Sequence, residues 1–249
     1  MIQVGTSGWQ YRDWKGAFYP DELPQRRWLD FYATRFSTVE VNNSFYRLPD
    51  GDTFERWCRE TPPGFVVTVK ASRFITHLKR LKDPEDPVGL LWERATRLGP
   101  RLGPILFQLP PRFPADPDRL SSFLRVLPSR MHPAFEFRDP SWHTPQVFRL
   151  LDRAGAALVW ADLPGARIHL PVTAGRAYVR FHQGRPHAAG YTADKLRRWA
   201  DRISELELGE GWLYFNNDPG GAAPRDAVRL RTLLEERGVR TADPPPDRP

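Results

Sequence analysis

Residues 39–46 of the chain read VEVNNSFY. Val39 and Val41 have the character of a buried strand, whereas Glu40 and Asn42 occupy the alternate positions. Because side chains alternate across a strand, this pattern puts the valines on one face and the polar groups on the other. Strands of a parallel barrel are covered on both faces and usually read as continuous apolar runs, so the polar face needs an explanation.

Similar strands recur along the whole chain. Eight are predicted, at residues 2–9, 38–45, 65–72, 104–111, 134–142, 157–164, 177–184 and 212–218. Apolar residues at helical spacing fill several intervals, over 28–36, 120–127, 147–154 and 196–203. This alternation predicts an α/β fold, a (β/α)8 TIM-type barrel in a single domain. A doubly wound open sheet is the alternative, but the first strand–helix junction has no G-x-G-x-x-G.

Several residues predict where elements begin and end. Thr192 is suited to cap the helix at 196–203, and Gly155 and Gly238 follow helical stripes as C-terminal glycines do. Residues 10–25 predict a structured, aromatic-rich loop over the first strand, and residues 79–89 a charged, proline-broken excursion. We expect the domain to span 1–240 and the proline-rich tail, 241–249, to be disordered.

The composition of the 249 residues is that of a packed globular protein, with 40% hydrophobic residues, 9 Trp and 15 Phe. No apolar run approaches the roughly 18 residues of a membrane span. The N-terminal residues lack the layout of a signal peptide. Cys58 is the single cysteine, which excludes an intrachain disulfide and a cysteine-cluster zinc site. We therefore expect a cytoplasmic protein with no membrane partner.

The net charge is +7 with a pI of about 9.8, and only five of the 37 basic residues are lysines. One interpretation is an arginine-rich composition with a solvated surface. The other is an anionic partner, because the planar guanidinium fork suits phosphate. Charge alone does not separate the two interpretations.

The polar faces of seven predicted strands converge at their C-terminal ends, where barrel enzymes build their sites. The residues placed there are Glu40, Asn42, Lys70, Gln108, Glu136, Arg138, Asp162, Arg180, His182, Asn216 and Asp218. A ligand site is the favoured interpretation. The alternative is an interior ion network, with Glu136–Arg180 or Asp162–Lys70 pairs holding the barrel closed. Buried charges kept only for structure would contribute little net stability.

Individual residues leave alternatives open. His182 is a candidate general base or a core histidine satisfied by Asp162. Lys70 could form a Schiff base or an ion pair. Glu40, Glu136, Asp162 and His182 could together ligate a divalent metal. The cations Lys70, Arg138 and Arg180 already supply positive charge in the same space, so no cofactor is predicted and a metal is the secondary hypothesis.

The loops near the predicted mouth add basic and aromatic groups. His77 lies in RFITHLKR (73–80) beside Arg73, which suits phosphate contacts, although a solvated loop is the simpler explanation. Trp142 belongs to a set of aromatics interleaved with cations. Such aromatics stack bases or sugars, or pack as a hydrophobic lid. Packing is expected for most of them and stacking for one or two.

Eight motifs, in order along nearly the whole chain, resemble the YecE-like family, also called domain of unknown function 72. They are GTSGW (5–9), WKGAFYP (14–20), VEVNNSFYRLP (39–49), VKASRFITH (69–77), FQLPPRF (107–113), FEFRDPSW (135–142), YVRFHQG (178–184) and YFNND (214–218). The resemblance implies a TIM-like barrel with sites at the strand ends and no established reaction.

The family's barrel is remotely similar to the endonuclease IV and xylose isomerase type, which implies nucleic-acid or sugar-phosphate binding. Those proteins use metal clusters of His, Asp and Glu. This chain departs from that pattern, because Lys70, Arg138 and Arg180 occupy the equivalent space. Asp139 also stands where family members often have histidine, so that position supplies no histidine base.

The leading hypothesis is an enzyme that acts by acid/base chemistry on a phosphate-containing ligand, a nucleotide or nucleic acid. Glu40, Glu136, Asp162 and His182 are the candidate catalytic residues. The candidate substrate-binding residues are Asn42, Lys70, Arg73, His77, Gln108, Arg138, Trp142, Arg180, Asn216 and Asp218. The alternatives are a metal-dependent sugar-phosphate isomerase or lyase and a non-catalytic nucleic-acid-binding module. The sequence gives no indication of a protein partner.

Overall fold

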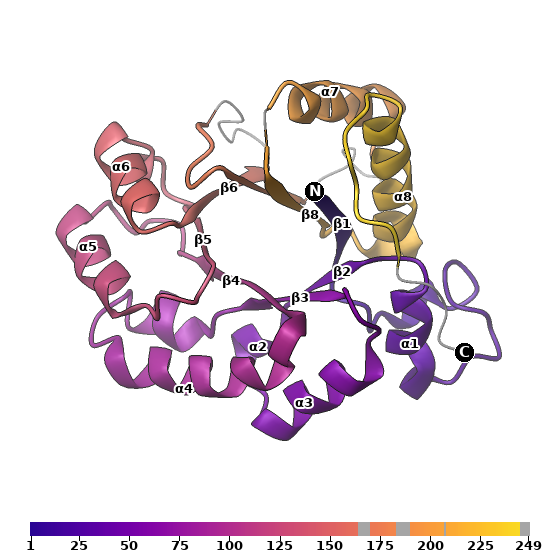
Figure 1. Ribbon diagram of the computed structural model, residues 1–249, viewed down its shortest axis with the longest axis horizontal. Coiled ribbons are helices and arrows are strands. Elements are labelled where there is room, and N and C mark those ends of the chain that lie inside the picture. Colours follow the sequence, from indigo (N-terminus) through magenta and orange to yellow (C-terminus); the bar gives the residue numbers. More distant parts are fainter. Residues whose placement is uncertain (164–169, 183–189, 207, 245–249) are drawn as a thin grey trace.

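The predicted barrel is confirmed. The structure is a computed structural model that describes residues 1–163, 170–182, 190–206 and 208–244. Eight parallel strands follow one another in sequence order around a closed barrel, and β1 pairs with β8 to complete it (Figure 1). The strands are β1 (Ile2–Ser7), β2 (Thr38–Val41), β3 (Val66–Lys70), β4 (Leu102–Gln108), β5 (Pro133–Glu136), β6 (Ala157–Asp162), β7 (Arg176–Phe181) and β8 (Glu210–Phe215).

Each predicted strand begins within two residues of the observed one, but all end later than the observed strands do. The difference is largest for the segment predicted at 134–142, where β5 ends at Glu136. The polar residues that follow the strands therefore belong to the loops of the barrel mouth. Gln183, Gly184 and Pro164, at the ends of two predicted strands, lie outside the described residues.

Helices surround the barrel on its outer face (Figure 1), apart from the one-turn helix Asn43–Tyr46, which lies at the mouth. They are α1 (Trp28–Ala33), α2 (Asn43–Tyr46), α3 (Gly51–Glu60), α4 (Glu85–Ala95), α5 (Pro117–Val126), α6 (Pro145–Arg153), α7 (Ala193–Ser204) and α8 (Ala222–Glu235). The Thr192 side chain accepts a hydrogen bond from Lys195 N and so caps α7 as predicted. Gly155 and Gly238 take positive φ values of 63° and 75° after α6 and α8, also as predicted.

The prediction that residues 79–89 form a charged, proline-broken excursion is only partly correct. Arg80, Leu81 and Asp83 have positive φ, so this part is an irregular turn. Glu85 nevertheless begins α4, and Pro87 lies in the first turn of that helix, where proline is tolerated because its missing N–H has no intrahelical acceptor.

The loop at 10–25 packs Trp14, Phe18 and Tyr19 into the hydrophobic core outside the barrel. Tyr19 stacks on Trp28 with ring centroids 4.6 Å apart, and Trp14 is fully buried. Trp14 Nε1 donates to Asp218 O at 2.9 Å, which ties the loop to the segment after β8. The loop is therefore structured, as expected, and closes one side of the mouth.

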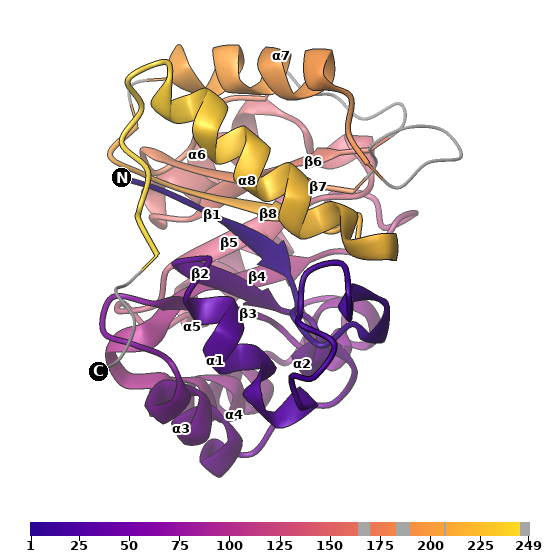
Figure 2. The same cartoon turned by 90° about the vertical axis from the view of Figure 1, so that its right-hand side faces the viewer.

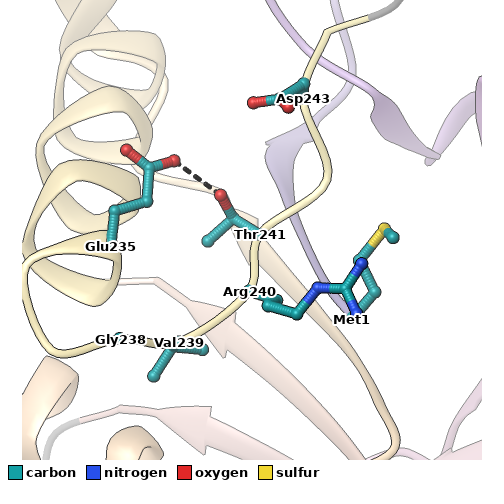
Figure 3. Close-up of a pocket in the computed structure, with 7 residues that line it drawn as sticks. All are labelled: Met1, Glu235, Gly238, Val239, Arg240, Thr241 and Asp243. Atoms are coloured by element: carbon teal, nitrogen blue, oxygen red, sulfur yellow. Dashed lines mark hydrogen bonds between the residues drawn. The ribbon is translucent and has the colours of Figure 1, made fainter.

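The chain ends of the described part meet at the end of the barrel opposite the mouth (Figure 2). Ala242 N donates to Ile2 O at 2.8 Å, and Thr241 forms a bridge with Ile2. Thr241 Oγ1 also donates to the Glu235 carboxylate beside a shallow cavity of about 390 Å³ (Figure 3). The first residues of the predicted disordered tail are thus bound to β1, and 245–249 lie outside the described residues.

The barrel interior changes from apolar to polar along its axis. The half away from the mouth holds a buried cluster that includes Leu106, Val159, Trp212 and Tyr214. Tyr214 lies across the interior, with its hydroxyl 2.7 Å from Thr38 Oγ1 and 2.8 Å from Thr68 Oγ1. The alternate residues of the strands form the main core between barrel and helices. The half of the interior next to the mouth carries the charged residues.

Candidate functional site

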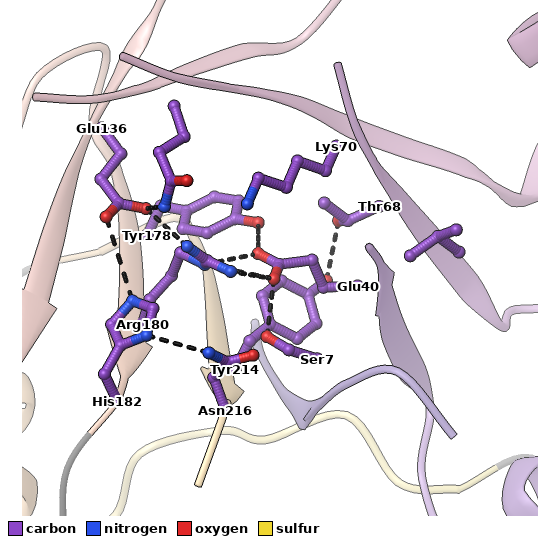
Figure 4. A network of polar contacts seen from close by, with 12 residues as sticks. Ser7, Glu40, Thr68, Lys70, Glu136, Tyr178, Arg180, His182, Tyr214 and Asn216 are labelled. Carbon is purple, nitrogen blue, oxygen red and sulfur yellow. Dashed lines mark hydrogen bonds and ion pairs between the residues drawn. The ribbon is translucent and has the colours of Figure 1, made fainter. Parts of the chain in front are cut away.

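Arg180, on β7, is the centre of a buried charged network (Figure 4). Its Nη2 donates to Glu40 Oε1 at 2.7 Å, and its Nη1 donates to Glu136 Oε2 at 2.6 Å. All three side chains are at most 1% exposed. We call Glu40, Glu136 and Arg180 the carboxylate floor, because they lie at the base of the mouth. The Glu136–Arg180 pair proposed for an interior ion network is confirmed.

Glu40 is satisfied on every side. Besides Arg180, it accepts hydrogen bonds from Ser7 Oγ at 2.6 Å and Tyr178 OH at 2.5 Å. Burial alone raises the pKa of Glu40, but the Arg180 guanidinium and these hydrogen bonds outweigh it and hold the pKa below its ordinary value. Glu40 is therefore a carboxylate at neutral pH.

Glu136 is held in the same way by its neighbours. Gln108 Nε2 donates to Glu136 Oε2 at 2.9 Å, and Arg138 forms an ion pair with Oε1. Burial raises the pKa of Glu136, but the charges of Arg180 and Arg138 prevail and hold it far below the usual range. The same two carboxylates raise the pKa of Arg180 against the effect of its burial, so all three groups of the floor stay charged.

Above the floor lies a cavity of about 360 Å³, which we call the mouth cavity. Seven of the predicted site residues line it: Asn42, Lys70, Gln108, Arg138, Arg180, His182 and Asn216. Tyr11 and Tyr46 complete the lining. Six strands, β2, β3, β4, β5, β7 and β8, and the loops after them thus bring together most of the predicted site.

His182, with 11% of its side chain exposed, lies between hydrogen-bonding partners at the edge of this cavity. Arg138 Nη2 lies 3.3 Å from His182 Nε2, and the Asn216 side-chain amide lies 3.0 Å from Nδ1. Burial, followed by the charge of Arg180, lowers the pKa of His182 to about 3. The ring is therefore neutral at physiological pH, and its Nε2 lone pair accepts from Arg138. Because Arg138 already occupies the Nε2 lone pair, this geometry agrees better with His182 as a neutral hydrogen-bond acceptor than as a general base.

Lys70 differs from the other charged residues of the site. Its side chain is 8% exposed, and Nζ lies 4.2 Å from the centroid of the Phe45 ring. Lys70 O accepts from Ser44 Oγ, but within the described residues Nζ makes no hydrogen bond or ion pair. Burial and the charge of Arg180 lower its pKa to about 8. The predicted pair with Asp162 is not formed.

Asp162 lies on the outer face of β6, so the prediction that it points into the barrel is wrong. It pairs with Lys195 Nζ at 2.8 Å and accepts from Tyr191 OH at 2.6 Å. The interior face of β6 carries Ala157 and Val159 instead. The bulky Trp160, on the same face as Asp162, belongs to the core outside the barrel.

Trp142 is also far from the role predicted for it. It is fully buried, stacks on Phe137 with centroids 4.9 Å apart, and donates from Nε1 to Phe113 O at 2.6 Å. With no exposed surface it cannot stack on a ligand, so packing is its function in this structure. The packing alternative holds for this residue.

Arg73 and His77 lie outside the lining of the mouth cavity. Arg73 is exposed, whereas His77 packs edge-on against Phe45 with centroids 4.9 Å apart. Its Nδ1 lies 2.9 Å from Thr76 Oγ1, and burial followed by the Lys70 charge lowers its pKa. Both residues are therefore on the rim, as a loop position predicts.

Asp218 lies beside the mouth cavity without lining it. Burial raises its pKa to about 7, although a hydrogen bond with Tyr11 acts in the opposite direction. Tyr11 OH also contacts Ser7 O at 2.5 Å. Asp218 thus borders the site through Tyr11.

Tyr11 and Tyr46 of the cavity lining are absent from the predicted site set, as are two residues that contact the carboxylate floor, Ser7 and Tyr178. Both contact Glu40, and both have the strand parity of the other interior residues. That parity is the sequence signal by which they could have been found. Their hydroxyl groups carry no charge and so do not stand out in the sequence.

The metal-ligand set proposed as an alternative is not assembled. Asp162 lies on the other side of the barrel wall from Glu40 and Glu136, and both glutamates are bound by Arg180. Across 1–163, 170–182, 190–206 and 208–244 there is no group of three His, Cys, Asp or Glu residues arranged to hold a metal ion. Nor does any helix in those ranges have the length and apolar character to cross a membrane.

Comparisons with known proteins agree with the fold. The chain is 28% identical to UPF0759 protein YunF of Bacillus subtilis, over 94% of this chain and 95% of that protein. UPF0759 protein YecE of Escherichia coli is 30% identical over 57% of this chain and 50% of its own length.

Solved structures give the same result. A DUF72 family protein from Thermotoga maritima has a TM-score of 0.83 and 31% identity, over 94% of this chain and 99% of that one. A second, from Enterococcus faecalis, has a TM-score of 0.81 at 19% identity and covers this chain completely. More distant barrels, SacUVDE and the 3-hexulose-6-phosphate synthase from Salmonella typhimurium, share the fold alone, at 10% and 12% identity.

The family model described as protein of unknown function DUF72 matches residues 3–249. This match confirms the resemblance found in the sequence motifs, and the chain belongs to the DUF72 family.

Proposed function

We propose that this chain is a cytoplasmic enzyme that binds a small phosphate-bearing molecule in the mouth cavity. The observation that carries the proposal is a surplus of positive charge. Among the described residues, the cations Lys70, Arg138 and Arg180 face two carboxylates that stay ionised, Glu40 and Glu136. An anionic ligand would balance the remaining charge in a space where charges are poorly screened.

Arg138 is the best placed group to contact the anion. Arg180 is 1% exposed and donates to both carboxylates, so it has little left to offer a ligand. Arg138 is 23% exposed and lines the cavity. Its guanidinium can present paired N–H groups to phosphate oxygens. Lys70 adds a positive field from the other side of the cavity.

The size of the cavity favours a small molecule. Its volume of about 360 Å³ is near the lower end of the range for ligand pockets. The amides of Asn42, Gln108 and Asn216 line it and are suited to hydroxyl groups or base edges. Asn42 Oδ1 is buried and has no hydrogen-bond partner among the described residues. A mononucleotide or sugar phosphate fits these features.

The acid/base roles follow from the charge states. Glu40 and Glu136 stay ionised at neutral pH, and His182 stays neutral, so none of these groups is a proton donor there. Lys70, with a pKa of about 8, is the lining residue best able to exchange a proton near neutrality. We therefore assign the floor to electrostatic positioning and the proton chemistry to Lys70.

Single-stranded nucleic acid is the second candidate ligand. Exposed aromatic side chains, Tyr46 at 74% and Phe74 at 45%, lie beside the mouth near the exposed Arg73. The contact between Phe45 and His77 brings their two segments together. Such a surface can stack bases while the cation contacts the backbone.

Calorimetric titration tests the proposal with inorganic phosphate, AMP, ribose 5-phosphate and a short single-stranded DNA as probes. Wild-type protein is expected to bind the small phosphates, and Arg138→Met to bind them at least tenfold more weakly. Arg73→Met is the matched control, since Arg73 lies outside the cavity lining, and it should leave small-phosphate binding unchanged. Equal affinity of Arg138→Met and wild type would refute the proposal. Loss of DNA binding in Arg73→Met alone would favour the second candidate.

A further inference from the structure

The Lys70 amine ends in the mouth cavity without a partner. Figure 4 shows its side chain extending from β3 toward the carboxylate floor, and no contact line reaches its nitrogen. No carboxylate of the described residues lies within ion-pair distance of Nζ. The group that lies close is the face of the Phe45 ring, at 4.2 Å. A buried lysine is usually paired, so this arrangement is unusual.

The neighbouring charges explain why Lys70 is unpaired. Glu40 and Glu136 are within its electrostatic reach, but Arg180 and Arg138 already bind their oxygens. The amine is thus buried beside two guanidinium groups, and its pKa falls to about 8. Roughly a tenth of such an amine is neutral at pH 7, against roughly one part in 2,500 for a lysine of ordinary pKa. The neutral amine is the nucleophilic form.

We propose that Lys70 is a catalytic nucleophile that forms an imine with an aldehyde or ketone group of the ligand. This inference rests on the proposed function, in which Arg138 holds the ligand's phosphate group. The substrate class is therefore a phosphorylated carbonyl compound. The Asn42 side chain, which lines the same cavity, could orient a hydroxyl group of that compound.

Imine formation needs no oxidant or reductant. The neutral Nζ attacks the carbonyl carbon, a C–N bond forms, and the carbonyl π electrons move to oxygen. The nitrogen loses a proton and the oxygen gains one, through water at the open mouth, to give a carbinolamine. That hydroxyl then leaves as water with one further proton from solvent. The product is a protonated imine, and hydrolysis reverses each step.

Reductive trapping tests this inference on the wild-type chain. The probes are glyceraldehyde 3-phosphate and glyceraldehyde, each with cyanoborohydride, whose hydride reduces the imine to a stable secondary amine. Peptide mass spectrometry then locates the adduct. At pH 7.5 Lys70 should be labelled at least tenfold faster than the exposed Lys15 and Lys82 of the same molecules. The phosphorylated aldehyde should label Lys70 faster than glyceraldehyde does.

Two variants separate this inference from the proposed function. Lys70→Arg keeps the positive charge and removes the nucleophile, so the single fast adduct should disappear from the intact mass spectrum. In Arg138→Met the phosphorylated probe should lose its rate advantage over glyceraldehyde, so the ratio of the two labelling rates should fall to about one. If Lys70 in wild-type protein is labelled no faster than Lys15 and Lys82 while phosphate still binds, the imine proposal is overturned and the proposed function stands. If Lys70 is labelled fast but phosphate does not bind, the imine proposal stands and the proposed function is overturned.

Discussion

The carboxylate floor and the mouth cavity are adjacent layers of one barrel, but they treat charge in different ways. In the floor, Glu40 and Glu136 each contact at least one guanidinium, and Arg180 contacts both. In the mouth cavity, the Lys70 amine and Asn42 Oδ1 have no hydrogen-bond partner among the described residues. The charges of the floor are paired with one another, whereas the Lys70 amine in the mouth is not paired with a carboxylate.

This difference indicates how stability and function are divided between the layers. Breaking a buried ion pair leaves a charge without compensation, so the floor should be sensitive to substitution. Groups that lack partners contribute little to folding and can be changed with small effect on stability. They are the groups that a ligand would satisfy. Substitutions in the two layers should therefore have opposite consequences.

The largest expected effect comes from Arg180→Met. It leaves two buried carboxylates without their shared cation, and we expect the free energy of unfolding to fall by about 3–5 kcal/mol. Lys70→Met is the comparison in the mouth. It removes a buried, unpaired charge of similar size, so it should not lower the unfolding free energy at pH 7. Urea denaturation of both variants checks this order, and the contrast between layers fails if Lys70→Met is the more destabilising.

A second, smaller effect concerns pH. The folded-state pKa values of Glu40 and Glu136 lie below their unfolded values, so their contribution to stability is complete above the unfolded pKa of about 4.3. It is lost as pH falls from about 5 toward the folded pKa values. The unfolding free energy of wild-type protein should decrease over this range, by up to about 1.4 kcal/mol for each unit of pKa difference.

In Arg180→Met the sign should reverse for Glu40, whereas Glu136 keeps its ion pair with Arg138. Without the Arg180 guanidinium, burial raises the folded pKa of Glu40, so acidification stabilises the variant relative to its state at pH 7. The stability gap between wild type and variant should thus narrow from pH 7 to pH 5. A gap that stays constant across this range, measured in urea at several pH values, would show that the floor carboxylates are not coupled to Arg180.

The smallest effect on stability should come from Asn42→Ala. Since Asn42 Oδ1 has no partner to lose, the unfolding free energy should change by less than about 0.5 kcal/mol. Affinity for a phosphorylated ligand with a free hydroxyl should fall about threefold to tenfold, which is the range for one neutral hydrogen bond. If Asn42→Ala is strongly destabilised but binds the ligand normally, Asn42 contributes to stability, as the floor residues do, and not to ligand binding.

Strand parity was sufficient to predict much of this site. In VEVN and AFEFRD, bulky apolar residues alternate with charged ones, so Glu40 and Glu136 could be assigned to the interior without ambiguity. The carboxyl ends of parallel strands lie at one edge, so residues far apart in the sequence could be expected to meet there. The pairing of Glu136 with Arg180 follows from the same reasoning.

Strand β6 shows where parity fails. In ALVWAD both faces are apolar, so alternation does not say which one is interior. Interior volume decides it, since the barrel accepts Ala157 and Val159 while Trp160 packs outside. The partners of Asp162, Tyr191 and Lys195, come about thirty residues later in a separate segment. Nothing in the local sequence identifies them.

The sequence also could not show that Lys70 lacks an ion-pair partner. The sequence supplies enough carboxylates to neutralise every interior cation. Which cation is left unpaired depends on reach and on the number of donors. Arg180 donates from Nε, Nη1 and Nη2 and so occupies both glutamates, which a single ammonium group could not do. Three-dimensional geometry therefore decides which residue stays reactive.

The bridge between Thr241 and Ile2 has a practical consequence for experiments on this protein. It holds both ends of the described chain at the base of the barrel, on the side opposite the arrowheads of the strands (Figure 2). An affinity tag, a fluorophore or a sensor-surface linker attached beyond either end would therefore point away from the mouth. Immobilised in this way, the protein would present the mouth cavity to ligands in solution.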